Sequence, residues 1–183
     1  MDIFRLQERI PCRFQWQLFR LYHDSFPRYE RKPFRIILSM WKKGKTDIWV
    51  ITEKKKIIGF ASTINGDRLI LLDYLAILPK ERGRGYGCRM LSAFREQYQE
   101  KGFFVEIESV YEKSSECADH IRRKRFYERN GLKEMRVLAS VFDVPMELMG
   151  WNCQLDFQEY RLFYKENYSA FAAEHIHELS YPK

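Results

Sequence analysis

The residues that most clearly point to chemistry are three alternating glycines, Gly83, Gly85 and Gly87, set among arginines. An apolar run ends just before them, and an amphipathic helical pattern follows at once. Glycine lets the backbone take up conformations that a side chain forbids and lets it approach a ligand closely. Several backbone N–H groups can then converge at the positive end of the next helix, which suits a phosphate-bearing ligand. The pattern therefore predicts an anion-binding turn over residues 82–88.

Two common nucleotide-binding motifs do not fit this turn. A P-loop ends in Gly-Lys-Ser/Thr, whereas this chain has Gly87-Cys88-Arg89. The dinucleotide fingerprint needs a glycine three residues after its second one, and Cys88 takes that place. The anion is therefore not assigned by either motif.

Three carboxylates stand in strand-like segments, where they could accept a proton. Asp73 interrupts an otherwise apolar run, in which an unpaired charge would be costly. Glu106 and Glu108 share one face of the segment 103–110. Each of the three could instead form a structural ion pair with one of the many arginines, and that alternative stays open for each of them.

The elements that must position these residues follow from periodicity and turn signals. Helical spacing ends at Pro27 and resumes after Pro33, and Asn65-Gly66-Asp67 is a tight-turn signal. The run 69–78 is almost continuously apolar, as in a strand buried on both faces. A mixed α/β fold is expected, with helices at 16–26, 33–41, about 90–98, 118–129 and from about 156, and strands at 47–52, 57–64, 69–78, 103–110, 137–142 and 146–151.

Composition limits the class of protein. The 183 residues are 45% hydrophobic and 31% charged, which fits one folded domain over residues 1–183. The net charge of +7 allows nucleic acid, anionic lipid, a small polyphosphate or plain solubility. The four cysteines show no CxxC pairing, and neither a signal-peptide core nor a membrane-spanning run is present. A cytoplasmic protein without a metal site is expected.

Two segments together resemble the GNAT family of N-acetyltransferases. Arg82-Gly83-Arg84-Gly85-Tyr86-Gly87 is similar to the family signature Gln/Arg-x-x-Gly-x-Gly/Ala, and Leu75-Ala76-Ile77-Leu78-Pro79 looks like its usual lead-in. Residues 125–132 are similar to the family's Phe-Tyr-x-x-x-Gly-Phe segment, here with Leu132 last. The clear resemblance covers about residues 57–141. It implies a central, mixed, mostly antiparallel twisted β-sheet of about six to seven strands flanked by helices, with a C-terminal helical extension at about 155–180.

The resemblance also implies a donor and a reaction. Acetyl-CoA would give its acetyl group directly to a primary amine of a small molecule or peptide. Backbone groups would bind the pyrophosphate at Arg82, Gly83, Arg84, Gly85, Tyr86, Gly87 and Cys88, and the pantetheine arm at Ala76, Ile77 and Leu78. Tyr127 matches the family tyrosine that acts as general acid toward the CoA sulfur. Glu108 or Asp73 would serve as base, unless water does.

The acceptor side is the least defined part of the resemblance. Phe26, Tyr29 and Glu30 lie where this fold usually builds its acceptor pocket, although ordinary packing explains them equally well. His120 stands where the family commonly has an asparagine that meets CoA, and the connection Tyr111–Asp119 is longer than usual. A monomer or homodimer without nucleic-acid or membrane partners is expected. The alternative is a non-catalytic, acyl-CoA-binding regulatory domain of the same fold.

Overall fold

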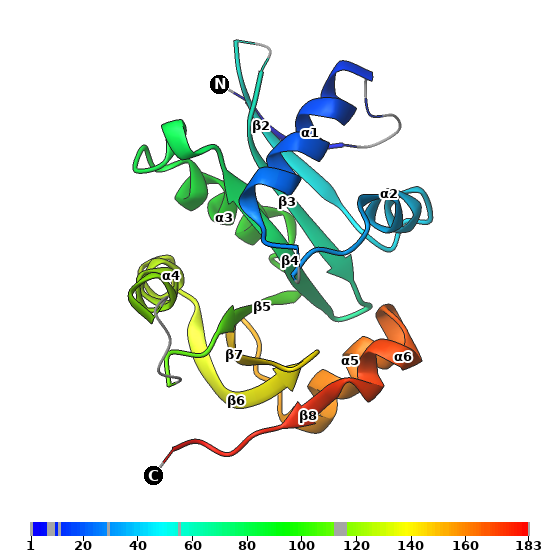
Figure 1. Ribbon diagram of the computed structural model, residues 1–183, viewed down its shortest axis with the longest axis vertical. Coiled ribbons are helices and arrows are strands. Elements are labelled where there is room, and N and C mark those ends of the chain that lie inside the picture. The colour runs from blue at the N-terminus through cyan, green and yellow to red at the C-terminus, as the bar shows by residue number, and fades with distance from the viewer. Residues whose placement is uncertain are drawn as a thin grey trace. The chain divides into compact units, whose positions relative to one another are not determined.

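A computed structural model describes residues 2–6, 10, 12–28, 30–54, 56–111 and 117–182 of the chain. The chain divides into two compact units, the first formed by Met1–Asn65 and Leu72–Gln99 and the second by Gly66–Leu71 and Glu100–Lys183. Figure 1 shows the elements of both.

The first unit contains two N-terminal helices, four strands and the helix that follows the glycine turn. In chain order these are β1 (Asp2–Arg5), α1 (Cys12–Ser25), α2 (Phe34–Lys42), β2 (Ile48–Glu53), β3 (Lys56–Asn65), β4 (Leu69–Ile77), whose first residues belong to the second unit, and α3 (Tyr86–Gln97). The strand order is β1-β2-β3-β4, with β1 and β3 antiparallel to β2. β2 and β3 coincide with the strands expected at 47–52 and 57–64 and form an antiparallel hairpin.

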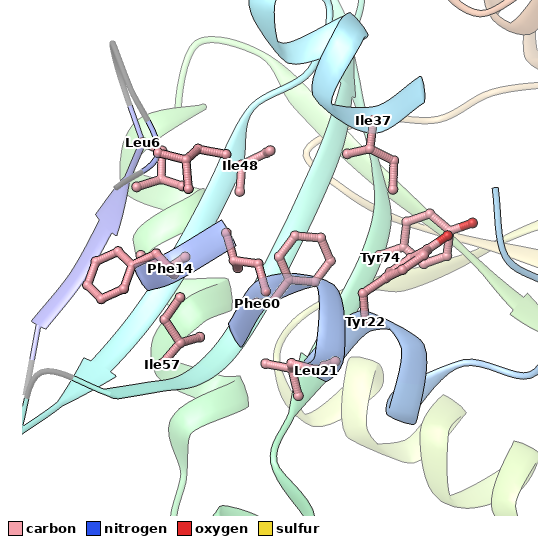
Figure 2. Packing of buried hydrophobic residues seen from close by; sticks show 13 residues of the cluster. Leu6, Phe14, Leu21, Tyr22, Ile37, Ile48, Ile57, Phe60 and Tyr74 are labelled. Carbon is pink, nitrogen blue, oxygen red and sulfur yellow. The ribbon is translucent and has the colours of Figure 1, made fainter. Parts of the chain in front are cut away.

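The sheet of the first unit is covered by helices on both faces, as the alternation of its side chains shows. Ile48 and Val50 of β2 belong to the apolar cluster that α1 and α2 bury, and Figure 2 shows Tyr22, Phe60 and Tyr74 in the same cluster. Trp49 lies between them in sequence and therefore points to the other face. There its ring contacts Phe94 of α3 at 4.9 Å. This double covering explains why β4 is almost continuously apolar.

The second unit contains β5 (Gly102–Glu108), α4 (Cys117–Arg129), β6 (Lys133–Val141), β7 (Val144–Trp151), α5 (Phe157–Asn167), α6 (Ala170–Glu174) and β8 (Ile176–Glu178). Its strand order is β5-β7-β6-β8, and each of these neighbouring pairs is antiparallel. Phe104 of β5 packs against α5, where its ring contacts Phe163 at 5.1 Å. Glu147 of β7 faces Ile107 across the ladder, so it lies on the opposite face of the sheet, where α4 packs.

The predicted fold class is confirmed, but the chain ends differ from expectation. The described residues form eight strands where six to seven were expected, because the short strands β1 and β8 pair with β2 and β6. The predicted helical extension over 155–180 is therefore wrong after Glu174. Ile176 to Glu178 pair with β6 instead, which satisfies the backbone groups of that sheet edge.

Burial of phenols and of one thiol predicts that this protein loses stability in alkali. Burial raises the pKa of Tyr127 to about 12 and that of Cys153 to about 11, and it raises the pKa of Tyr98 and Tyr160 as well. The unfolded chain then loses these protons at a lower pH than the folded chain. The free energy of unfolding is consequently undiminished below about pH 9 and falls as the pH rises toward 12, by up to about 1.4 kcal/mol per group and pH unit.

Urea unfolding at pH 8, 9.5 and 11, with tyrosinate absorbance followed in parallel, measures this loss. We expect the urea midpoint to drop between pH 9.5 and 11 and the buried tyrosines to ionise together with unfolding. Ionisation of all tyrosines near pH 10 with an unchanged urea midpoint would contradict the expectation.

Candidate active site

The glycine turn has the backbone conformation that its sequence predicts. After β4, a short 3₁₀ turn (Pro79–Glu81) leads to Gly83 and Gly85, which have φ values of +76° and +78°. Side chains rarely adopt this left-handed conformation, so glycine is needed at both positions. A Cβ atom at either glycine would have nothing within 4 Å, which leaves open space for a ligand to approach the backbone.

The start of α3 offers hydrogen-bond donors at the turn. Gly85 is the N-cap residue, and no side chain caps the helix. The first helical bond that involves it runs from the N–H of Arg89 to the carbonyl of Gly85, at 3.0 Å. A helix leaves its first N–H groups without intrahelical partners and carries a partial positive charge at this end. This geometry suits a phosphate or pyrophosphate, and binding at residues 82–88 stays a prediction.

The side chains around the turn hold its shape. Nε of Arg82 donates to the carbonyl of Ile77 at 3.2 Å, and Arg84 forms an ion pair with Glu81 at 2.8 Å. The hydroxyl of Tyr86 lies 3.4 Å from Oε1 of Glu53. Since Glu81 partly neutralises Arg84, the backbone rather than that arginine dominates the attraction for an anion. Cys88, in the first turn of α3, is an exposed free thiol.

The end of β4 offers some of its backbone groups to a ligand and uses others internally. The N–H of Leu78 donates to Ile58 of β3, and its carbonyl accepts from Glu81. Because backbone groups alternate in direction along a strand, Ala76 shares the direction of Leu78, whereas Leu75 and Ile77 direct theirs away from β3. Of the three residues predicted to meet the pantetheine arm, Ile77 directs its backbone groups away from β3, but its carbonyl already accepts the hydrogen bond from Arg82, so pairing with the arm stays a prediction.

Tyr127 is a buried phenol on α4. Its side chain is 7% exposed, and its ring contacts that of Phe126 at 5.1 Å. Burial raises its pKa to about 12, the nearby Arg123 guanidinium opposes this rise, and the Glu108 carboxylate adds to it. The phenol therefore keeps its proton at neutral pH and can donate it.

The candidate base Glu108 lies in the same neighbourhood as Tyr127. Its side chain, 12% exposed, forms an ion pair with Arg123, which precedes Tyr127 by one helical turn. The structure therefore brings together two of the predicted catalytic residues and adds an arginine that the sequence analysis did not assign to them. Glu106, the third carboxylate considered, accepts hydrogen bonds from Tyr160 and Tyr164 of α5 at 2.6 and 2.7 Å.

The candidate base Asp73 belongs to the first unit and is paired with Lys32. The distance from Nζ of Lys32 to Oδ1 of Asp73 is 2.7 Å. The next residue along β4, Tyr74, donates from its hydroxyl to the carbonyl of Glu30, and its ring lies 4.8 Å from that of Phe26. The ring of Phe26 and the backbone of Glu30, two of the predicted acceptor residues, thus contact Tyr74, the residue after Asp73. Tyr29 lies outside the described residues.

His120 and its surroundings are only partly defined. Nδ1 of His120 lies 3.3 Å from the carbonyl of Ser109, just after β5. Residues 112–116 of the preceding connection lie outside the described residues.

Sequence reasoning missed two lysines that pair with strand carboxylates, Lys32 with Asp73 and Lys124 with Glu147. Glu147 interrupts the apolar stretch of β7 in the same way that Asp73 interrupts β4, so the same signal could have identified it. Neither lysine has such a signal, because each stands in a polar segment where solvent exposure is the usual outcome.

Metal and membrane sites have no counterpart in the part of the chain that the structure describes. Across residues 2–6, 10, 12–28, 30–54, 56–111 and 117–182, no three His, Cys, Asp or Glu side chains are grouped so as to hold a metal ion. No helix among those residues is long and apolar enough to span a membrane.

Comparison with known proteins identifies the family and the fold. Residues 44–134 match the family described as Acetyltransferase (GNAT) domain. No curated protein matches the chain. A protein from Bacteroides thetaiotaomicron assigned to the GNAT acetyltransferases superposes with a TM-score of 0.70 at 20% identity, over 91% of this chain and 98% of its own.

Two further solved structures share the fold. An aminoglycoside 6′-N-acetyltransferase complexed with coenzyme A has a TM-score of 0.67 at 15% identity, over 85% of this chain and 100% of its own. The ribosomal-protein-S18-alanine N-acetyltransferase from Escherichia coli has a TM-score of 0.61 at 13% identity, over 85% of this chain and 96% of its own. At these identities the likeness confirms the predicted fold and leaves the acceptor open.

Proposed function

This chain belongs to the GNAT family of N-acetyltransferases, and we propose that it transfers the acetyl group of acetyl-CoA directly to a primary amine of a small molecule or peptide. The observation that carries the proposal is the uncapped start of α3 behind two glycines of positive φ. Residues 82–87 are similar to the family's donor-binding signature, and the geometry of this turn suits a pyrophosphate.

The donor-side roles follow from the backbone. N–H groups of the turn would hold the pyrophosphate of CoA, and the outward-directed backbone groups of Ile77 would pair with the pantetheine arm. The N–H of Leu75 shares that direction, which suits polarisation of the thioester carbonyl. Acetyl-CoA itself supplies the activated acetyl group as a thioester.

The proton-transfer roles fall to side chains. Tyr127 would donate its phenolic proton to the sulfur of the departing CoA, a role for which the phenol carries its proton at neutral pH. The proton that the amine must lose would pass to Glu108 or Asp73, or to water. Phe26, Tyr29 and Glu30 would contact the acceptor. Similarity to the aminoglycoside and ribosomal-protein enzymes supports an amine as acceptor without choosing between a small molecule and a protein.

Product analysis with a glycine variant tests the donor side. Incubation with acetyl-CoA and a panel of primary amines should release CoA and give acetylated products. CoA is best quantified by chromatography, because the exposed thiol of Cys88 would react with thiol reagents. In Gly85→Ala, strain at φ +78° and a methyl group in the turn should weaken acetyl-CoA binding about tenfold or more, equivalent to roughly 1.4 kcal/mol.

Gly44→Ala is the matched control for this variant. Gly44 lies in the same unit, in the turn after α2, with φ +72° and nothing within 4 Å of a Cβ atom. It should lose as much thermal stability as Gly85→Ala and keep its acetyl-CoA affinity. Equal acetyl-CoA affinity in both variants and the unaltered chain would contradict the proposed role of the turn.

A further inference from the structure

The connection between α1 and α2 is fixed to the sheet by two buried phenols. The hydroxyl of Tyr74 donates to the carbonyl of Glu30 at 2.7 Å and accepts from the N–H of Lys32 at 3.2 Å. The hydroxyl of Tyr22 donates to the carbonyl of Lys32 at 2.9 Å. Tyr22 and Tyr74 are 1% and 6% exposed, so these hydrogen bonds are shielded from water. The backbone of Lys32 therefore has one well-defined position.

This fixed backbone places the Lys32 ammonium on the Asp73 carboxylate. The two groups are 2.7 Å apart, and their side chains are 19% and 11% exposed. The ammonium also lies 5.7 Å from the centre of the Tyr74 ring, which attracts a cation. A charge-assisted hydrogen bond with so little access to water is much stronger than a surface ion pair.

The Lys32–Asp73 ion pair affects whether a ligand that binds beside it is favoured by a positive or by a negative charge. A carboxylate among aromatic rings would by itself attract a cationic amine. Here the Asp73 carboxylate already binds the Lys32 ammonium. Because Lys32 is part of the same chain, its effective concentration at Asp73 is high, and a free amine would have to compete with it for the carboxylate. The pair as a whole is neutral, but Lys32 is its more exposed partner, at 19% against 11% for Asp73. A group that approaches from solvent therefore meets the ammonium first, which repels a second positive charge on the acceptor and attracts a carboxylate.

We propose that Lys32 determines acceptor specificity, so that the preferred acceptor carries an acidic group close to the amine that is acetylated and polycationic amines are disfavoured. This inference rests on the proposed function and on the placement of the acceptor beside Phe26, Glu30 and Asp73. Lys32 would contact the acceptor's carboxylate, and the amine would remain the group that accepts the acetyl.

Matched acceptors that differ in one charge test the inference. β-Alanine and β-alaninamide, and glycylglycine and its amide, are compared with spermidine, with acetylated product measured by mass spectrometry. The unaltered chain should favour each acid over its amide at least tenfold in kcat/KM, mainly through KM. Lys32→Met should lose that preference and gain at least tenfold toward spermidine, whereas Lys32→Arg should retain the preference.

Binding measurements separate this inference from the proposed function. Calorimetric titration of the same acceptors into CoA-saturated protein reports charge selectivity without turnover. If Lys32→Met is too unstable to test, Lys32→Met/Asp73→Asn removes both charges and should bind acid and amide equally. Acetyl transfer with no acid preference, or an acid preference that persists in Lys32→Met, would overturn the inference alone. Charge-selective binding without acetyl transfer to any amine would overturn the proposed function instead.

Discussion

Replacing Tyr127 by phenylalanine is expected to lower kcat by about 10²- to 10⁴-fold, the usual contribution of a positioned general acid. The change removes one oxygen from a side chain that is 7% exposed and leaves its ring packing against Phe126 in place. The departing CoA thiolate would then have to take its proton from water. Because the phenol contributes to proton transfer rather than to binding, KM for acetyl-CoA should change little.

Tyr164→Phe is the control for this variant. It also removes one buried phenolic oxygen, but Glu106 keeps its hydrogen bond from Tyr160, and the residue has no proposed catalytic role. Its kcat should stay within about twofold of the unaltered chain, because a lost hydrogen bond of about 1 kcal/mol affects stability instead. Full kcat in Tyr127→Phe would remove Tyr127 from the acid role.

The pH dependence of kcat gives a second test of the same residue. A pKa of about 12 keeps Tyr127 largely protonated up to about pH 11, so the acid form is present throughout the neutral and mildly alkaline range. Loss of the Tyr127 proton should therefore not lower kcat below about pH 11. If kcat falls between pH 8 and 10, the pH profile of kcat in Tyr127→Phe should have the same shape as that of the unaltered chain.

Replacing Lys124 by methionine is expected to give the largest loss of stability, about 3–5 kcal/mol. Nζ of Lys124 lies 2.5 Å from Glu147 and 3.1 Å from Glu134, and the Glu147 side chain is fully buried. Burial by itself would lower the pKa of Lys124, but the hydrogen bonds and charges of the two glutamates raise it, so the lysine stays charged. Removing it leaves the Glu147 carboxylate buried without a cation.

Thermal unfolding measures this loss, which corresponds to a drop in Tm of roughly 10 °C for a chain of this size. Lys165→Met on the exposed face of α5 is the matched control and should melt within a degree or two of the unaltered chain. The double variant Lys124→Met/Glu147→Gln should recover most of the lost stability, because no charge is then buried and the N–H of Val110 keeps its acceptor. A single variant that melts like the unaltered chain would contradict the role given to the pair.

Local patterns were enough to predict the main elements of both units. The hairpin of β2 and β3, the buried strand β4 and the helix α3 each have a periodicity or turn signal within their own residues. The two end strands have none, because β1 and β8 are only four and three residues long. They form where a neighbouring strand offers unpaired backbone groups, which is a property of the assembled sheet.

The charge pairs around the candidate site could not be predicted in the same way. Lys32 is 41 residues from Asp73, and Lys124 is 23 residues from Glu147. Each carboxylate interrupts an apolar strand, which indicates that it needs a cation as partner. The identity of that cation depends on how a helix or connection packs on the sheet. The chain offers many lysines and arginines, so the sequence does not single one out.

The sequence by itself determined the conformation of the glycine turn. Gly83 and Gly85 adopt positive φ because they have no Cβ, and a helix that follows them exposes its first N–H groups whatever the rest of the chain does. Only the tertiary structure decided the electrostatics of the candidate bases. It placed Lys32 on Asp73 and Arg123 on Glu108, because charges from distant parts of the chain meet only after the helices have packed against their strands.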